Sequence, residues 1–402
     1  MSRYWKILPA MLALAGLAGA VSPSHFLQAQ GQETVTGTEF GDPIQGISAT
    51  EFELFRLGLD DFLEVEDAEE GLGPVFNGRS CAECHSVPRI GGSGTVMILR
   101  AGIIYPDGRF EDPPGGSSIQ MFSVPSHEVQ PLIPTEVNVI ARRKALPLFG
   151  NGLIEAVPDE FFLALEDPND ADGDGISGRA HRVLDKESGD IRVGRFGWKA
   201  QQASLFTFGA EAYLNEMGIT NDLFPEEVCP GGDCELIELV DTVPDPEDAP
   251  ERSTGLRGID NFANFLRLLG PPPRGEITEQ VQRGKMLFES VQCASCHVPA
   301  LRTGPHSVRA LSVKRFEPYS DLLLHDIGTG DGIGQDQAEP GEIRTPPLWG
   351  LRVRTPFLHD GRAFTLRQAI EMHAGEAENS RKAFEALTES EIVDLLAFLR
   401  SL

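Results

Sequence analysis

The spacing of apolar side chains predicts helices at matching places in the two halves of the chain. Residues 277–290 have apolar positions at helical spacing, and Thr278 is placed to cap the first turn. Residues 52–62 and 256–269 have corresponding patterns in the first half. Three consecutive prolines at 271–273 cannot continue a helix, so they mark a natural boundary between the halves.

The last helix has the strongest pattern. Thr388, followed three residues later by Glu391, forms a capping box. Behind it, one apolar stripe recurs with the helical period and consists of Ile392, Leu395, Leu396, Leu399 and Leu402. A Phe-Leu-Arg-x-Leu string occurs at 265–269 and again at 398–402, so the two closing helices repeat each other.

Composition excludes several classes of partner. The chain has 34 basic against 61 acidic residues, a net charge of −27, so nucleic acid and anionic membrane surfaces would repel it. Hydrophobic residues make up 41% and charged residues 24%, as in a globular protein. Past the first 25 residues no apolar run reaches about 18 residues, so we expect no membrane span in the mature chain.

The N-terminus has the pattern of a secretory signal. Residues 1–20 run from a basic start through a short apolar stretch to a small-x-small end, which predicts cleavage after Ala20. The alternative is a retained anchor, but the apolar stretch is short and Pro9 interrupts it. Loss of Arg3 and Lys6 would take the net charge to −29. We therefore expect export to the periplasm, an oxidising compartment.

All six cysteines fall in close pairs, and the outer two pairs belong to C-x-x-C-H strings. These strings consist of Cys81, Cys84 and His85, and of Cys293, Cys296 and His297. C-x-x-C-H is the attachment signature of haem c, in which the two thiols bind the porphyrin edge and the histidine binds the iron. Two such strings in an exported chain predict two covalently bound haems.

Other interpretations of these pairs fit less well. The pairs lie too far apart for the usual zinc spacing, and neither stands in the context of a thioredoxin-like redox pair. Two plain disulfides would leave both histidines unexplained. The middle pair, Cys229 and Cys234, has no histidine and stands in a Pro/Gly turn, so a small structural disulfide is the better interpretation.

A helix, a C-x-x-C-H string, loops and a closing helix resemble a cytochrome c domain. We therefore expect a mainly α-helical fold of two cytochrome c-like domains, residues 35–272 and 276–402, the first enlarged by a long insertion. A second repeat aligns residues 147–152 with 356–361 and places Gly152 opposite Gly361. Counting 12 residues onward pairs His373 with Ala164, a possible ligand with a methyl group.

The strings that carry the wider likeness are distributed over nearly all of the mature chain. They are residues 76–85, 146–159, 194–199, 322–328, 344–350 and 357–362. With them the sequence resembles the bacterial di-haem oxidoreductase family, which is related to di-haem cytochrome c peroxidases and to MauG-type proteins.

The resemblance implies unequal haems. In the relatives the residue 12 past the glycine of the H-D-G string is the second axial ligand of the electron-transfer haem, here His373, with Met372 as the fallback. In those relatives the N-terminal haem is the active one, and here Glu155 and Glu160 are candidates for its acid/base group. At the positions that match the segment around Gly150, the relatives carry the motif F-W-D-G-R. Its Trp lies between the two haems, and a Gln and later a Glu follow it in the sequence.

This chain departs from that pattern. Gly150 stands where the tryptophan would be, which puts the inter-haem relay in doubt, and Trp198 or Trp349 could replace it or simply pack in the core. Sixth ligands of the first haem could come from His127, His181, Met97 or Met121, although each also suits packing or the surface.

A smaller signal concerns a cation. Asp170, Asp172 and Asp174 fit the first half of a calcium loop, but position 12 is His181 and not glutamate, so a calcium site and a solvated acidic turn both remain open.

The resemblance thus implies a peroxide-reducing enzyme in which electrons enter at the C-terminal bis-His haem and chemistry occurs at the N-terminal haem. The alternative is a non-catalytic di-haem electron-transfer cytochrome. A strongly acidic surface favours a small cationic periplasmic donor, either a cytochrome or a copper protein.

Overall fold

The computed structural model describes residues 34–402 except 126–128, 230, 232, 242 and 244–245. The expected signal sequence and the candidate ligand His127 lie outside the described residues. No helix in the described part of the chain is long and apolar enough to cross a membrane.

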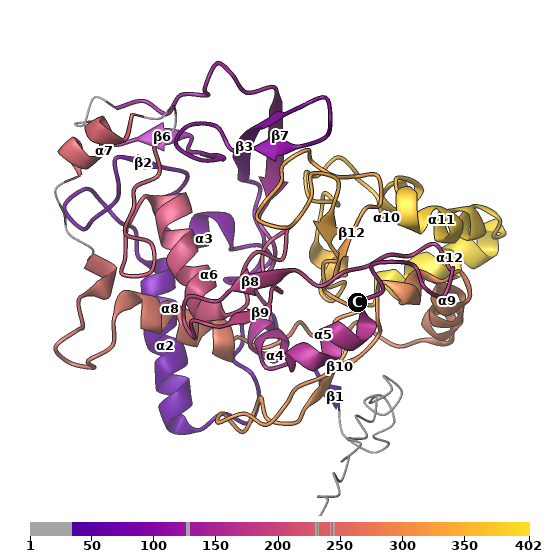
Figure 1. The fold of residues 1–402 in the computed structure, drawn as a ribbon. Helices are drawn as coiled ribbons and strands as arrows, with labels where there is room; N and C mark the ends of the chain where they lie inside the picture. The colour runs from indigo at the N-terminus through magenta and orange to yellow at the C-terminus, as the bar shows by residue number, and fades with distance from the viewer. Residues whose placement is uncertain (1–33, 126–128, 230, 232, 242, 244–245) are drawn as a thin grey trace, which may run out of the picture.

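Two pairs of crossing helices organise the halves of the molecule (Figure 1). In the first half α2 (Ala49–Leu63) packs against α8 (Gly258–Leu268), and in the second half α9 (Glu279–Ser290) packs against α12 (Glu389–Leu399). Figure 1 shows the first pair on one side of the molecule and the second pair on the other. The four helices lie where the apolar patterns predict them.

The predicted caps and core positions are confirmed. Thr278 accepts a hydrogen bond from the amide of Val281, and Thr388 and Glu391 form the expected capping box. All five side chains of the terminal stripe are buried.

A glycine allows each pair of helices to cross closely. A Cβ atom on Gly58 would lie 2.8 Å from Cβ of Phe265, and one on Gly284 would lie 2.8 Å from Cβ of Phe398. Four residues after each glycine, Phe62 or Phe288 packs its ring against the histidine of the nearby C-x-x-C-H string, at 6.3 Å between ring centroids in both cases. The two halves therefore repeat in packing as well as in sequence.

The first half also contains most of the sheet structure. The longest strand, β3 (Met97–Ile104), pairs antiparallel with β4 (Phe110–Glu111), β5 (Ser118–Ile119) and β7 (Val139–Lys144). Helices account for 31% of the described residues and strands for 14%. The expectation of a mainly α-helical protein is therefore met only in part, because the inserted segment forms strands and irregular loops around the helices.

The remaining elements are short. The helices are α3 (Cys81–Cys84), α4 (Asn151–Glu155), α5 (Asp159–Leu165), α6 (Leu205–Ala212), α7 (Cys234–Val240), α10 (Leu366–Glu371) and α11 (Glu378–Glu385), with a π-helical turn at Tyr213–Met217. The strands are β1 (Thr34–Val35), β2 (Val75–Phe76), β6 (Phe122–Ser123), β8 (Arg182–Leu184), β9 (Ile191–Val193), β10 (Leu301–Arg302), β11 (Arg315–Phe316), β12 (Leu324–His325) and β13 (Ile343–Arg344).

The two hydrophobic cores do not divide cleanly at the prolines. The larger core runs from Ile44 to Leu269 and also takes in Leu311, Phe316 and Trp349 of the second half. The smaller core contains Val281, Phe288 and the terminal stripe. The division into residues 35–272 and 276–402 therefore remains a prediction about sequence units that share packing.

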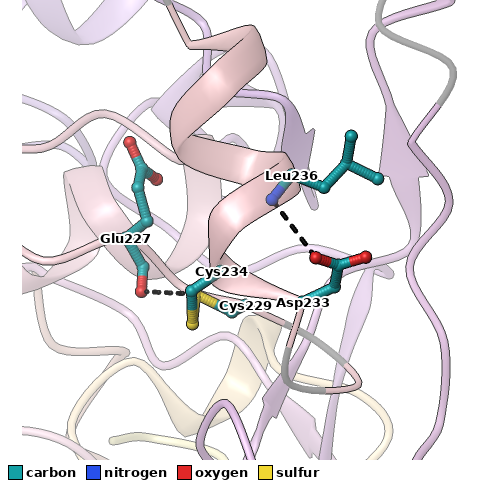
Figure 2. Close-up of a disulfide and its surroundings, with 5 residues drawn as sticks. All are labelled: Glu227, Cys229, Asp233, Cys234 and Leu236. Carbon is teal, nitrogen blue, oxygen red and sulfur yellow. Dashed lines mark hydrogen bonds between the residues drawn. A yellow bond between two sulfur atoms is a disulfide. The ribbon is translucent and has the colours of Figure 1, made fainter.

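The middle cysteine pair forms the expected disulfide. Cys229 is bonded to Cys234, and Asp233 caps the first turn of α7 by accepting a hydrogen bond from the amide of Leu236 at 3.2 Å (Figure 2). This bond joins a loop to the start of a short helix, which fits a local structural role.

Candidate functional site

Each C-x-x-C-H string forms a tight turn at the edge of a cavity. The amide of His85 donates to the carbonyl of Cys81 at 3.1 Å, and the amide of His297 donates to that of Cys293 at 3.0 Å. Ser80 caps α3 through its side chain, which explains why the first string starts as a helix. The turn brings the two thiols and the imidazole of each string onto one cavity wall.

Backbone carbonyls orient the two imidazoles. Nδ1 of His85 donates to the carbonyl oxygen of Gly92 at 3.0 Å, and Nδ1 of His297 donates to that of Tyr319 at 3.1 Å. A carbonyl partner on Nδ1 fixes the tautomer in which Nε2 is free to bind a metal. Burial, with a smaller effect of His373, lowers the pKa of His297 to about 4, so this imidazole is neutral.

The four cysteines of these strings are free thiols. Burial raises the pKa of Cys84 and that of Cys293 to about 12, so both stay protonated at neutral pH. Two additional disulfides, one of the alternative interpretations, are therefore not what the structure shows.

The second cavity holds a second imidazole. It encloses about 1330 Å³ including its open mouth, and both His297 and His373 line it. Nδ1 of His373 donates to the carbonyl of Ala369 at 2.7 Å, so Nε2 is again the free nitrogen. Met372 does not line this cavity and is 39% exposed, as expected for the neighbouring position on a helix. The structure thus brings together the two histidines that the resemblance pairs.

The first cavity has a different wall. It encloses about 1100 Å³ including its mouth, and His85 is the one histidine among the described residues that line it. Its polar lining includes Gln201, Glu211 and Glu216. Burial raises the pKa of both glutamates, against the opposing effect of Arg100. A raised pKa favours the protonated carboxyl, which can donate a proton in acid/base chemistry.

Buried arginines line both cavities. Those of the first cavity have N–H groups without a hydrogen-bond partner, and those of the second have no carboxylate paired with them. Nε of Arg100 and Nη2 of Arg143 lack a partner, and both side chains line the first cavity. Arg344 and Arg354 line the second cavity, and neither forms an ion pair with a carboxylate of the described chain. Burial lowers the pKa of Arg344 to about 9 and that of Arg354 to about 10.

The donor set fits a haem c in each cavity. Each large, mostly apolar space has two thiols and a free imidazole nitrogen on one wall, and buried cations that could meet the negatively charged propionates.

Trp198 lies between the two cavities and lines both of them. Its indole Nε1 donates to the carbonyl of Lys144 at 2.8 Å, which fixes the ring. The imidazole of His359, on the second cavity, meets this ring edge-on at 6.1 Å between centroids. Trp349 lines neither large cavity and packs on Gly150 in the larger core.

The sequence alignment of the internal repeat is wrong in its register. The amide of Gly150 donates to the carbonyl of Leu269, and the amide of Gly350 donates to that of Leu402, so Gly150 corresponds to Gly350. Gly152 is therefore not the counterpart of Gly361, as the sequence alignment had it. The reason is that α4 begins directly after Gly150, whereas residues 361–365 are not helical.

The true counterpart of the His373 segment begins at Phe196. Phe196 pairs with Gln202, and Phe357 pairs with Ala363, in the same kind of isolated bridge. The next residues match at constant offset: Trp198 with His359, Ala200 with Gly361, Ser204 with Thr365, and Ala212 with His373. Ser204 and Thr365 both cap the following helix with their side chains.

With this match, Ala212 and not Ala164 is the alanine at the first cavity. Ala212 lines the first cavity, as His373 lines the second, whereas Ala164 is exposed on α5 and lies on neither wall. The expected contrast between a ligand and a methyl group is therefore present, but at Ala212.

Glu155 and Glu160 are not on the first cavity. Glu155 is ion-paired with Arg267 at 2.6 Å and also accepts from the amide of Leu205. Although burial opposes it, Arg267 holds the pKa of Glu155 below its usual value. Glu160 is exposed in the first turn of α5. Neither position fits the expected acid/base role.

The other expected ligands of the first haem also lie elsewhere. Nδ1 of His181 donates to the carbonyl of Lys199, and Nε2 of the same ring accepts from the amide of Gln337. Met97 and Met121 do not line the first cavity. Met217, which belongs to no recognisable ligand motif in the sequence, does line it and is 4% exposed.

The acidic loop has the expected local shape. Oxygen atoms of Asp170, Asp172 and Asp174 lie within 4.8 Å of one another, and no ion is present. Hydrogen bonds from the loop's own amides to these carboxylates also suit an ordinary turn.

Comparison with known proteins gives a consistent picture. A family model described as "Di-haem oxidoreductase, putative peroxidase" matches residues 119–402. The methylamine utilization protein MauG of Methylorubrum extorquens is 31% identical over 142 residues, which cover 31% of this chain and 35% of that protein. Cytochrome c551 peroxidase of Nitrosomonas europaea is 28% identical over 130 residues, covering 32% of this chain and 36% of that protein.

The alignments thus span about a third of each of these two relatives. Among solved structures, the diheme peroxidase BthA of Burkholderia thailandensis is 16% identical, with a TM-score of 0.41 and coverage of 92% of both chains.

Proposed function

The chain belongs to the di-haem oxidoreductase family, and from this premise we propose that it is an exported enzyme that reduces peroxide with electrons from a small redox protein. The proposal has two haems c, bound covalently through Cys81 and Cys84 and through Cys293 and Cys296. His85 and His297 would bind the two irons. A haem in the first cavity would supply an iron that can bind and reduce peroxide when its sixth position is free.

The observation that carries this proposal is the difference between Ala212 and His373. The two residues occupy matching positions on their cavities, and only His373 can bind an iron. A six-coordinate haem mainly passes electrons, whereas an open site can bind a substrate. We therefore assign electron entry to the second cavity and peroxide chemistry to the first.

Glu211 and Glu216 take over the acid/base role first considered for Glu155 and Glu160. Both line the first cavity, and burial raises the pKa of each, which favours the protonated carboxyl that a proton donor needs. Gln201 lies on the same wall and could orient the substrate through its amide. The order Trp198, Gln201, Glu211 matches the Trp, Gln, Glu order implied by the family resemblance.

Trp198 is the natural relay between the sites, because its ring lines both cavities and a hydrogen bond holds it in place. His359 extends this contact on the side of the second cavity.

The partner and the compartment follow from charge and the N-terminal pattern. A net charge of −27 favours a cationic cytochrome or copper protein as donor. Residues 1–20 would direct export to the periplasm. Calcium at Asp170, Asp172 and Asp174 stays part of the proposal, as the geometry of the loop suits a hard cation.

One observation favours the second candidate, a pure electron-transfer cytochrome. Met217 lines the first cavity, and its thioether is a possible axial ligand. If Met217 bound the iron firmly, both haems would be closed and peroxide could not bind. Met217→Leu separates the two functions, because it should open a site only where Met217 is a ligand.

The decisive experiment assigns the ligands of each haem and measures turnover. We expect one open or exchangeable iron, one bis-His iron that becomes open in His373→Ala, and peroxide-dependent oxidation of a reduced donor. Glu211→Gln combined with Glu216→Gln should lower turnover by about 10²- to 10⁴-fold. Glu160→Gln is the matched control and should leave turnover unchanged. Two low-spin irons in every redox state, with no turnover, would contradict the enzyme and favour the cytochrome.

A further inference from the structure

A buried imidazole at the edge of the second cavity connects two segments of the chain. His325 is 3% exposed and lies between two carboxylates: Nε2 is 3.0 Å from Asp321 and Nδ1 is 2.7 Å from Glu376. Because both ring nitrogens face carboxylate oxygens, the ring needs both of its protons to satisfy them. Sequence spacing alone gave His325 no partner.

The two carboxylates come from different segments of the second half of the chain. The amide of Asp321 donates to the carbonyl of Cys296 at 2.9 Å, beside the attachment string. Sγ of Cys296 lies 3.9 Å from Nδ1 of His325. Glu376 stands three residues after His373 and lines the same cavity. His325 therefore bridges the segment that holds His297 and the segment that holds His373.

Glu376 pins its own segment at several points. Its carboxylate accepts from the amide of Asp326 at 2.8 Å and from the amide of Ser177 at 2.9 Å. Its own amide donates to the carbonyl of Asp326 at 3.0 Å, and the amide of Ala374 donates to that of Ile327 at 2.8 Å. The contact with Ser177 comes from the first half of the chain, so the halves meet at this carboxylate.

Among the described residues that line the first cavity, no imidazole lies between two carboxylates. The residue that matches Glu376 at the constant offset of the repeat is Asn215, whose Nδ2 donates to the carbonyl of Glu211 in its own helical segment. The set of two carboxylates around an imidazole is thus present beside His373, whereas side-chain amides of Asn77 and Gln120 hold the segment that follows Ala212.

We propose that Asp321, His325 and Glu376 form a clasp that holds His373 on the iron and keeps the sixth position of the second haem closed. These are positioning residues, and the inference rests on the proposed function in assigning His373 as a ligand. Charge-assisted hydrogen bonds between buried groups are strong, so loss of the Glu376 charge should loosen His373 by about tenfold or more.

The test measures carbon monoxide binding to the fully reduced holoprotein. Wild type should bind one molecule per chain, at the first haem. Glu376→Gln, which keeps the shape of the side chain, should bind a second with an apparent affinity raised by about tenfold or more. Amide exchange at Ala374 and Glu376 should also become faster. Glu378→Gln is the matched control, since Glu378 is exposed and pairs with Lys382 on its own helix, and it should behave as wild type.

Asp321→Asn gives a second variant at the far end of the clasp, should Glu376→Gln fail to fold, and it should open the site in the same direction. If wild type binds one carbon monoxide and both variants do the same with unchanged exchange, the clasp is refuted while the assignment of His373 stands. If wild type already binds two, or His373→Ala changes nothing, the assignment of His373 fails and the clasp fails with it.

Discussion

Replacement of Gly284 by alanine tests how strictly the crossing of α9 and α12 shapes the second haem pocket. The added Cβ atom would lie 2.8 Å from Cβ of Phe398 and would overlap the backbone oxygen of Asp394. Carbon atoms in contact are about 3.5 Å apart or more, so the helices must separate by roughly 0.7 Å at least. A backbone oxygen cannot turn aside as a side chain can.

The free energy of unfolding should therefore fall. Overpacking of a tight core costs about 1–3 kcal/mol, and the rigid neighbour places this site at the upper end. Replacement of glycine by alanine in a helix returns about 1 kcal/mol. We expect a net loss of about 2 kcal/mol, together with a shift of Phe288 against His297 that changes the spectrum of the second haem.

Urea unfolding, followed by haem absorbance, measures both effects. Met286→Ala on the same helix is the control, because Met286 is 62% exposed, and it should stay within about 0.5 kcal/mol of wild type. Gly58→Ala should have the same cost but perturb the first haem. A Gly284→Ala protein as stable as wild type, with an unchanged spectrum, would refute the close crossing and its link to the pocket.

Four further predictions concern the relay, the charges and the ions. Trp198→Phe should slow electron transfer from the second haem to the first in rapid-mixing experiments without changing either set of iron ligands; an unchanged rate would exclude this tryptophan as relay. Burial raises the pKa of Glu66 to about 8, above its unfolded value of 4.5, so stability should fall as pH rises from 4.5 toward 8; Glu66→Gln should be more stable than wild type at pH 8, by about 2 kcal/mol after allowance for screening, and equal to it at about pH 4. Calcium should raise the unfolding temperature of wild type but not of Asp172→Asn, and an equal rise in both would eliminate the acidic loop as a site. Turnover with a cationic donor should fall as salt is added, and independence of salt would contradict electrostatic steering.

Local chemistry made much of the fold predictable from sequence. Thr278 and Thr388 cap their helices as expected, because a hydroxyl before an apolar run has few better uses. His85 and His297 follow their thiols on the same turn. The strands of the inserted segment were not predicted, since β3 is embedded in short strands and loops without a repeating pattern.

The first cavity was harder to predict, because its residues come from positions that carry no local signal. Glu211 and Glu216 are ordinary acids on a helix and a π-helical turn, and only folding brings them to the wall that contains His85. The motif around Gly150 favoured Glu155 as the acid/base group, but the carboxylate of Glu155 forms an ion pair with Arg267. A search for Ser or Thr caps ahead of both segments could have found the true register.

The two halves share the same backbone arrangement around their cavities, and the two sites differ because of a few side chains. Both halves have a glycine at the helix crossing, a phenylalanine against the attachment histidine and a capped helix leading to the cavity. At the end of that helix one half has Ala212 and the other has His373, followed by the carboxylate that His325 holds. A histidine introduced at Ala212 would consequently lack the carboxylate of Glu376, because Asn215 stands at the matching position. We expect it to occupy the sixth position of the first haem less firmly than His373 occupies that of the second. The helix places the histidine at the cavity in both halves, but only the second half has the clasp that keeps it there.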